Sequence, residues 1–202
     1  MAQADWAVVP TGARTCGGEI RLHRVEGLGR THAVTATVRL EHLTVDNWEE
    51  VAELSVAEEQ QGTVASNLYS IAESRFLPGF LTKAVISETD TVGFAMYGPD
   101  PDDGHIWLYR LMIDHRFQRR GFGRLALREV VRAVSHEFGA QTLRLGVAPQ
   151  NGTAISLYES SGFRPTGQFI GSEKIYQLEI TDAPCDTCEL SRAPAAAPQR
   201  RR

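Results

Sequence analysis

The chain has 202 residues, of which 42% are hydrophobic, and a formal net charge of -4 at pH 7. This length suffices for one domain with its own hydrophobic core, and no apolar run approaches the roughly 20 residues that span a bilayer. The N-terminus lacks the basic-then-apolar order of a signal peptide, and three cysteines provide no even disulfide framework. We therefore expect a cytoplasmic protein with neither a membrane nor a nucleic acid as its partner.

Both ends of the chain differ in composition from the middle. Residues 1–33 contain scattered polar residues and several glycines without a sustained period, and residues 182–202 are rich in Pro, Ala and Arg. We expect an N-terminal extension over 1–33, a folded domain over 34–181 and a disordered tail over 182–202. The tail contains Cys185 and Cys188 in a C-x-x-C pair, but a zinc site needs two further ligands, so we expect no metal.

The first half of the domain predicts a strand, two helices and a hairpin. Alternating apolar residues predict the strand over 34–40. Asp46, with Glu49 three residues later, forms a capping box that predicts a helix over 45–54. The second helix and the two strands of the hairpin are predicted over 66–75, 81–87 and 92–97.

The second half predicts four further strands and two helices. The strands are predicted over 106–113, 142–147, 165–170 and 173–180. One helix follows a glycine-bearing turn and runs to about Phe138, and the other lies between Asn151 and Gly162. The resulting order, β-α-α-β-β-β-α-β-α-β-β, predicts a mixed α+β domain.

The most informative segment is Gln118-Arg119-Arg120-Gly121-Phe122-Gly123-Arg124, between a predicted strand and a predicted helix. Such a turn directs several backbone N–H groups to one point, which binds phosphate with the help of the helix dipole. Gly121 and Gly123 let a ligand approach closely, and the three arginines add positive charge. The segment therefore predicts a site for a polyphosphorylated ligand.

Two other phosphate motifs do not fit this segment. A Walker A loop requires Gly-Lys-Ser/Thr at a fixed distance from an earlier glycine, and the chain has no such sequence. A dinucleotide-binding fingerprint requires a third glycine, which the segment lacks at the right offset. On this motif alone, an ordinary strand–helix turn remains the alternative.

A second motif occupies the predicted helix between Asn151 and Gly162. Asn151 is a suitable N-cap, Gly162 is a suitable terminator, and Ala154, Leu157 and Tyr158 mark one face. By itself, Tyr158 would be interpreted as a core tyrosine. Together and in this order, the patterns Gln-x-x-Gly-x-Gly and Asn-x-x-Ala-x-x-Leu-Tyr-x-x-x-Gly-Phe resemble the GNAT N-acetyltransferases, which bind acetyl-coenzyme A (acetyl-CoA).

The resemblance implies a mixed, mostly antiparallel central sheet flanked by helices. Its splayed fourth and fifth strands, here 106–113 and 142–147, admit the pantetheine arm of acetyl-CoA. It also implies that Tyr158 protonates the departing thiolate, whose intrinsic pKa is about 8.5, and that a backbone N–H at Met112 or Ile113 stabilises the oxyanion. The coenzyme-binding residues that it implies are Met112, Ile113, Gln118, Arg119, Arg120, Gly121, Phe122, Gly123, Arg124, Asn151 and Tyr158.

The charge distribution favours a cationic acceptor. Residues 34–105 carry three Lys/Arg against thirteen Asp/Glu, a net of -10, whereas residues 106–181 carry ten against six, a net of +4. Such a field raises the local concentration of an oppositely charged substrate. A solvated acidic surface is the alternative interpretation, and it is preferred for the glutamates of the first predicted helix.

The front half also resembles one GNAT branch, the bacterial diamine and spermine/spermidine acetyltransferases. The matching features are the strand Val-Gly-Phe-Ala-Met-Tyr-Gly at 92–98 and the residues Gln60, Val64, Asn67 and Ser70. The chain departs from the branch at Thr63, where an aromatic residue is common. We predict that Glu58, Gln60, Asn67 and Tyr109 bind the acceptor, and the resemblance supports Gln60 and Asn67 among them.

The general base is left open by the sequence. Many GNAT enzymes place a Glu on the fourth strand, where this chain has Trp107, Tyr109 and Leu111 at alternating positions. An imidazole can act as a base near neutral pH, and a carboxylate can act through a water molecule. The candidates are His105 at the start of the strand and Glu59, with Glu58 and Glu73 as alternatives.

The sequence thus predicts an acetyl-CoA-dependent N-acetyltransferase that acts on a primary amine, a diamine or polyamine, by direct attack in a ternary complex. No cysteine lies near the motifs, which argues against an acyl-enzyme. The alternatives are an acetyltransferase for an antibiotic or a protein or peptide amine, and a non-catalytic acetyl-CoA-binding regulatory module. Tyr158 favours the enzyme, because binding alone needs no acid. The resemblance also implies that a homodimer is a common assembly.

Overall fold

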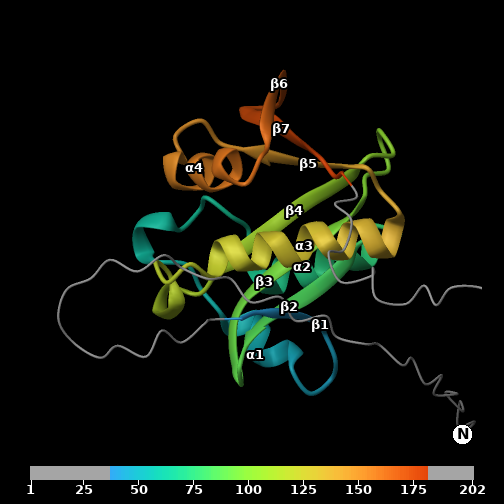
Figure 1. The fold of residues 1–202 in the computed structure, drawn as a ribbon. Coiled ribbons are helices and arrows are strands. Elements are labelled where there is room, and N and C mark those ends of the chain that lie inside the picture. Colours follow the sequence, from blue (N-terminus) through green and yellow to red (C-terminus); the bar gives the residue numbers. More distant parts are fainter. Residues whose placement is uncertain (1–36, 182–202) are drawn as a thin grey trace, which may run out of the picture. The chain divides into compact units, whose positions relative to one another are not determined.

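The computed structural model describes residues 37–181, in which seven strands form one sheet in the order β1-β2-β3-β4-β5-β7-β6 (Figure 1). The strands are β1 (Arg39–His42), β2 (Leu81–Ser87), β3 (Asp90–Pro99), β4 (Ile106–Ile113), β5 (Thr142–Val147), β6 (Arg164–Ile170) and β7 (Glu173–Glu179). The α-helices are α1 (Trp48–Glu53), α2 (Asn67–Glu73), α3 (Phe122–Phe138) and α4 (Gly152–Ser160). Short 3-10 turns are η1 (Glu58–Gln60), η2 (Ser74–Phe76) and η3 (His115–Phe117).

Strands β4 and β5 are parallel, whereas the other neighbouring strands of this sheet are antiparallel. Trp107 and Arg144 form the single pair recorded between β4 and β5 in the described part of the chain. Beyond this pair the two strands part toward their C-terminal ends. The predicted mixed, mostly antiparallel sheet with splayed fourth and fifth strands is confirmed.

The two faces of the sheet carry separate hydrophobic clusters. On one face, α3 and α4 pack against alternate residues of β5, namely Leu143, Leu145 and Val147. On the other face, α1 and α2 cover β2, β3 and β4, with Val51 and Phe94 fully buried there. This alternation follows from the two-residue period of a strand. The splayed C-terminal ends of β4 and β5 lie between the helices that cover one face of the sheet and those that cover the other.

Most predicted elements are confirmed, and 106–113 and 142–147 are strands over their whole predicted lengths. The first strand is an exception, because it covers Arg39–His42 rather than 34–40. Pairing with β2 determines the bounds of this strand, in which Arg39 lies opposite Ile86 and His42 lies opposite Lys83.

The capping box predicted for the first helix is wrong. The N-cap of α1 is Asn47, not Asp46. Asn47 Oδ1 accepts the Thr44 N–H at 2.7 Å, and the Asp46 N–H donates to Thr44 Oγ1 at 3.2 Å. The side chains of Thr44 and Asn47 therefore form a local turn, and the helix begins two residues after Asp46.

The predicted N-terminal extension, C-terminal tail and Cys185/Cys188 pair lie outside the described residues. Within residues 37–181 no helix is both long and apolar enough to cross a bilayer. In the same range, no three His, Cys, Asp or Glu side chains gather where they could hold a metal ion.

Candidate active site

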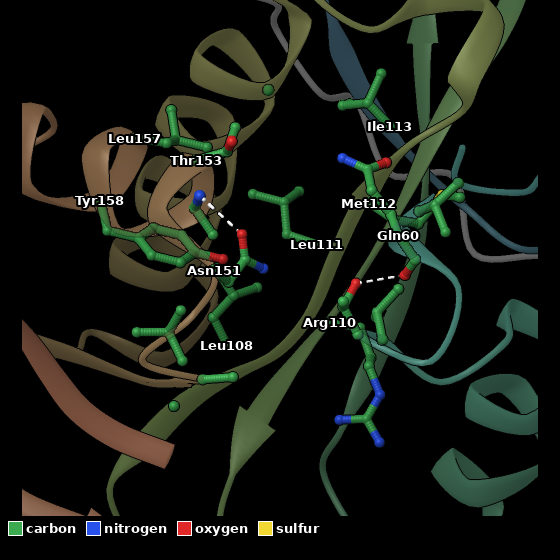
Figure 2. A pocket seen from close by; sticks show the side chains of 18 of the residues that line it. Gln60, Leu108, Arg110, Leu111, Met112, Ile113, Asn151, Thr153, Leu157 and Tyr158 are labelled. Carbon is green, nitrogen blue, oxygen red and sulfur yellow. Dashed lines mark hydrogen bonds between the residues drawn. The ribbon is translucent and has the colours of Figure 1, made fainter. Parts of the chain in front are cut away.

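A cavity of about 1080 Å³ opens where β4 and β5 part (Figure 2). Its walls come from both strands, from the turn before α3, from α4 and from the loop that carries η1. Because β4 and β5 pair only near Trp107 and Arg144, the C-terminal halves of these strands face open space. The cavity is large enough for a small-molecule ligand.

The turn before α3 presents backbone donors to this cavity. Its N-cap residue, Gly121, has φ 86°, and Arg119 has φ 61°, so the chain turns through two left-handed conformations. No side chain caps the helix, and no described residue accepts a hydrogen bond from the N–H groups of residues 119–123. These donors and the positive end of the dipole of α3 together form a site suited to an anion.

The arginines of this turn have different surroundings. Arg119 and Arg124 line the cavity. Arg124 Nη2 donates to Ser160 Oγ at 2.9 Å, which ties the start of α3 to the end of α4. The guanidinium of Arg120 lies outside the cavity, 5.6 Å from the ring centroid of Phe117. The cationic groups closest to a bound anion are therefore expected at Arg119 and Arg124.

The side chain of Gln118 connects the turn with β4 and with η1. Its Nε2 donates to Ile113 O at 2.9 Å and to Gln60 Oε1 at 2.7 Å. Gln60 Oε1 also accepts the Ala57 N–H at 3.3 Å. Gln118 and Gln60 both line the cavity, so their contact holds two of its walls together.

Backbone groups along β4 point alternately toward β3 and toward the gap. The Asp114 N–H donates to Val92 O on the β3 side at 2.9 Å, so Met112, two residues earlier and opposite Phe94, also faces β3. Ile113 therefore directs its N–H toward the gap, on the side where its carbonyl meets Gln118. Of the two oxyanion donors predicted from sequence, Ile113 has the suitable direction.

Tyr158 projects from α4 toward Leu111 and into the cavity (Figure 2). The predicted cap of this helix is confirmed, since Asn151 Oδ1 accepts the Ala154 N–H at 3.1 Å. Burial, and next the negative charge of Glu173, raises the pKa of Tyr158 to about 12. The phenol therefore keeps its proton at neutral pH and can donate it.

Acidic side chains line another part of the same cavity. They are Asp100, Asp102 and Glu173. The Tyr109 O–H donates to Asp100 Oδ2 at 2.5 Å. Burial, followed by the hydrogen bond to Asp100, raises the pKa of Tyr109 well above its ordinary value, so this phenol also stays protonated. The cavity thus has cationic side chains at the turn and carboxylates after the end of β3 and at the start of β7.

Comparison with known proteins agrees with this geometry. The sequence matches the Acetyltransferase (GNAT) family over residues 38–163. The chain belongs to the GNAT family. It is 26% identical to spermine/spermidine N(1)-acetyltransferase of Bacillus subtilis over 151 residues, which are 71% of this chain and 99% of that protein. It is 32% identical to ribosomal protein bS18-alanine N-acetyltransferase of Salmonella typhimurium over 103 residues, which are 51% of this chain and 57% of that protein.

Solved structures share the GNAT fold. PaiA N-acetyltransferase from Thermoplasma acidophilum, in complex with coenzyme A, matches with a TM-score of 0.52 and 20% identity, over 71% of this chain and 99% of that one. Spermidine N-acetyltransferase from Vibrio cholerae, in complex with CoA and spermine, matches with a TM-score of 0.56 and 15% identity, over 71% and 96%. By family, this GNAT protein is an N-acetyltransferase.

The GNAT fold brings together most of the residues that the sequence predicted for coenzyme binding. Arg120 is the exception, since it lies beside the cavity rather than on its wall. The residues of that set that line the cavity are Met112, Ile113, Gln118, Arg119, Gly121, Phe122, Gly123, Arg124, Asn151 and Tyr158.

The predicted acceptor-binding residues of this GNAT protein are only partly brought together. Gln60 and Tyr109 line the cavity, whereas Asn67 is buried against α1. Asn67 Nδ2 donates to Val51 O at 2.8 Å and lies 3.6 Å from Met112 Sδ. Its amide therefore stabilises the packing of α2 on α1 and β4.

The base candidates named from sequence lie outside the cavity. Glu58, also predicted for acceptor binding, and Glu59 are exposed on η1, and His105 precedes the N-terminal end of β4, away from the splayed ends. Glu73 forms an ion pair of 3.0 Å with Arg110.

Sequence reasoning missed three carboxylates of the cavity in this GNAT protein. Asp100 and Asp102 follow strand β3, and this acidic cluster at the end of a strand could have identified them from the sequence. Glu173 begins β7 and has no local sequence signal. Its position depends on Gly146 of β5, a residue that is far from it in sequence.

Proposed function

We propose that this GNAT enzyme transfers an acetyl group from acetyl-CoA to a primary amine of a diamine or polyamine. One observation carries the proposal: the N–H groups of residues 119 and 121–123, for which no described residue supplies an acceptor, border the same cavity as Tyr158. An anion site and a protonated acid thus share one space. This combination suits a phosphate-bearing carrier that releases a thiolate.

The charge of the turn before α3 suits acetyl-CoA. The diphosphate would bind at the turn before α3, where Arg119 and Arg124 add positive charge. The pantetheine arm would then enter the gap between β4 and β5. Two solved structures of this fold, from Thermoplasma acidophilum and Vibrio cholerae, are complexes with the coenzyme, which supports its use here.

The amine acceptor is supported by charge. Asp100, Asp102 and Glu173 line the cavity, and residues 34–105 carry the net charge of -10 given above. A diamine or polyamine is cationic at neutral pH and would be attracted to this region. The relatives named for spermine and spermidine support the same acceptor class.

The chemistry proceeds by direct attack. The neutral amine attacks the thioester carbonyl, the Ile113 N–H stabilises the developing oxyanion, and the C–S bond breaks. A single such donor is typically worth about 3 kcal/mol. Tyr158 then protonates the thiolate. Because nitrogen attacks the thioester carbon itself, no covalent acyl-enzyme is required.

A protein N-terminal amine is the second candidate acceptor. It is favoured by the 32% identity to the bS18-alanine N-acetyltransferase, a match that covers 51% of this chain. An α-amino group has a pKa near 7.7–8.0, so part of it is already neutral at physiological pH. Such a substrate would depend less on a base and on the carboxylates of the cavity than a polyamine would.

The test measures thiol release from acetyl-CoA with putrescine, spermidine, spermine, an aminoglycoside and a peptide that begins with alanine. We expect the highest kcat/KM with one of the first three. A higher kcat/KM with the peptide would contradict the polyamine acceptor and favour a protein N-terminal amine instead. Coenzyme binding without turnover of any amine would contradict the enzymatic function.

A further inference from the structure

Glu173 places its carboxylate over the backbone of Gly146. A Cβ at Gly146 would lie 2.5 Å from Glu173 Oε2, closer than side-chain atoms approach one another. In the β5–β7 ladder Gly146 is opposite Ile175, and Glu173, two residues before Ile175, has its side chain on the same face. The glycine therefore leaves a space on β5 that the Glu173 carboxylate occupies.

This carboxylate lies on the face of the sheet that is opposite α3 and α4. Leu145 and Val147 of β5 point toward those helices, so Gly146 between them points to the other face. Glu173 and Tyr158 line the same cavity and are close enough for the charge of Glu173 to raise the pKa of Tyr158. The gap between β4 and β5 thus has a proton donor reaching in from α4 and a carboxylate on the opposite face.

Unlike Asp100 and Glu73, Glu173 has no protein partner among residues 37–181, a property that it shares with the Asp102 carboxylate of the same cavity. Asp100 accepts the O–H of Tyr109, and Glu73 pairs with Arg110 at 3.0 Å. No described residue donates a hydrogen bond to the carboxylate of Glu173 or forms an ion pair with it. Its oxygens therefore remain available to a ligand in the cavity.

The geometry points to Glu173 as the general base that deprotonates the acceptor amine, a role that rests on the proposed function. An alkyl ammonium has a pKa near 10.4 and is not nucleophilic until it loses a proton. The first proton moves to the Glu173 carboxylate and then to solvent. The nitrogen lone pair forms the C–N bond as the C–S bond breaks. Tyr158 gives its proton to the thiolate, and the second nitrogen proton, passing through water, restores the phenol.

The test compares Glu173→Gln with Glu179→Gln, an exposed glutamate on the same face of β7 that lies outside the cavity. With the best amine of the panel, we expect kcat/KM of Glu173→Gln at pH 7 to fall about 100-fold or more, as for loss of a general base. Its KM for acetyl-CoA should change less than threefold. Its rate should rise about tenfold per pH unit toward the pKa of the amine, because the variant depends on amine that is already neutral. Glu179→Gln should match the wild type.

A second variant tests the role of Gly146. Gly146→Ala should displace the carboxylate and lower kcat/KM, but it should cost almost nothing further in the Glu173→Gln background, because both changes remove the same group. If the wild type acetylates amines and Glu173→Gln keeps its rate and pH profile within twofold, the base assignment is overturned and the proposed function stands. A wild type that acetylates no amine overturns both.

Discussion

Gln118 and Gln60 are joined by a hydrogen bond of 2.7 Å across 58 positions of the sequence. Gln118 belongs to the turn that presents backbone donors, and Gln60 ends the 3-10 turn η1 on another wall of the cavity. The same Nε2 of Gln118 donates to Ile113 O. This amide therefore sets the position of the turn before α3 relative to β4 and to the loop that carries η1.

Removing this bridge should cost stability. We expect Gln118→Ala and Gln60→Ala each to lower the free energy of unfolding by about 1 kcal/mol, since each removes the hydrogen bond between the two half-buried side chains. Because the two side chains share a bond, their effects in the double variant should be less than additive, by about 0.5–1 kcal/mol. Urea denaturation measures all three. Gln141→Ala, at an exposed position, is the control, and strict additivity would contradict the bridge.

Tyr158→Phe should lower kcat by about 100-fold or more and leave acetyl-CoA affinity nearly unchanged, because it removes only the acid. Since the pKa of Tyr158 is raised to about 12, the wild type should lose no activity through ionisation of this phenol up to about pH 10. Tyr176→Phe is the matched control, because it removes a hydroxyl that bonds Glu159 outside the cavity. If Tyr158→Phe turns over as fast as the wild type, Tyr158 does not act as the acid and only packs against its neighbours.

Gly121→Ala and Gly139→Ala separate backbone strain from ligand contact. Both glycines flank α3 in left-handed conformations, with φ 86° and φ 60°, and at both a Cβ would meet no protein atom within 4 Å. Each substitution should cost about 1–2 kcal/mol of stability. Only Gly121 lines the cavity, so only its substitution should weaken coenzyme binding, by tenfold or more in calorimetric titration. Equal affinities in the two variants would exclude a close approach at Gly121.

Asp114 should make stability depend on pH. Burial opposes its charge, but hydrogen bonds from the Arg116 side chain and from the Ser55 and Arg116 N–H groups outweigh burial and hold its pKa below the ordinary value. A depressed folded-state pKa means that the ionised carboxylate stabilises the protein above its unfolded pKa of about 3.9. That stabilisation is lost as the pH falls through the lower folded value.

Asp114→Asn should therefore reduce the free energy of unfolding at pH 7 by about 1–3 kcal/mol, since a buried, hydrogen-bonded charge is removed. The difference from the wild type should shrink as the pH falls below about 4. Denaturation in urea at several pH values measures both effects, with the exposed Asp46→Asn as the control. A difference that stays constant down to low pH would show that the charge of Asp114 has no part in it.

Salt should weaken the apparent affinity for a cationic acceptor. If Asp100, Asp102 and Glu173 attract the amine, its KM should rise as the ionic strength increases from about 0.01 to 0.5 M, where the screening length falls from about 30 Å to a few ångströms. The kcat at saturating amine should change little. The comparison substrate is the alanine peptide, which carries less positive charge than spermine. An equal response of the two substrates would contradict electrostatic attraction by these carboxylates.

Local sequence patterns predicted the elements that depend on neighbouring residues. Apolar runs set β4 and β5, and the N-cap at Asn151 forms through a contact only three residues away. The predicted cap at Asp46 failed because a neighbour of the same chemistry, Asn47, took the cap position. Residue type alone does not choose between two adjacent polar side chains, whereas the turn through Thr44 does.

The sequence by itself determined the glycine turn before α3 and the cap and inner face of α4, because short-range geometry places Gly121, Asn151 and Tyr158 at the ends and on the face of helices. Only the tertiary structure decided which carboxylate meets them. In the folded protein His105 and Glu59 lie outside the cavity, whereas Glu173 lines it. The reason is physical: the place of a side chain across a sheet is set by strand register, here that of β7 on β5, and register is a property of the paired strands rather than of either segment alone.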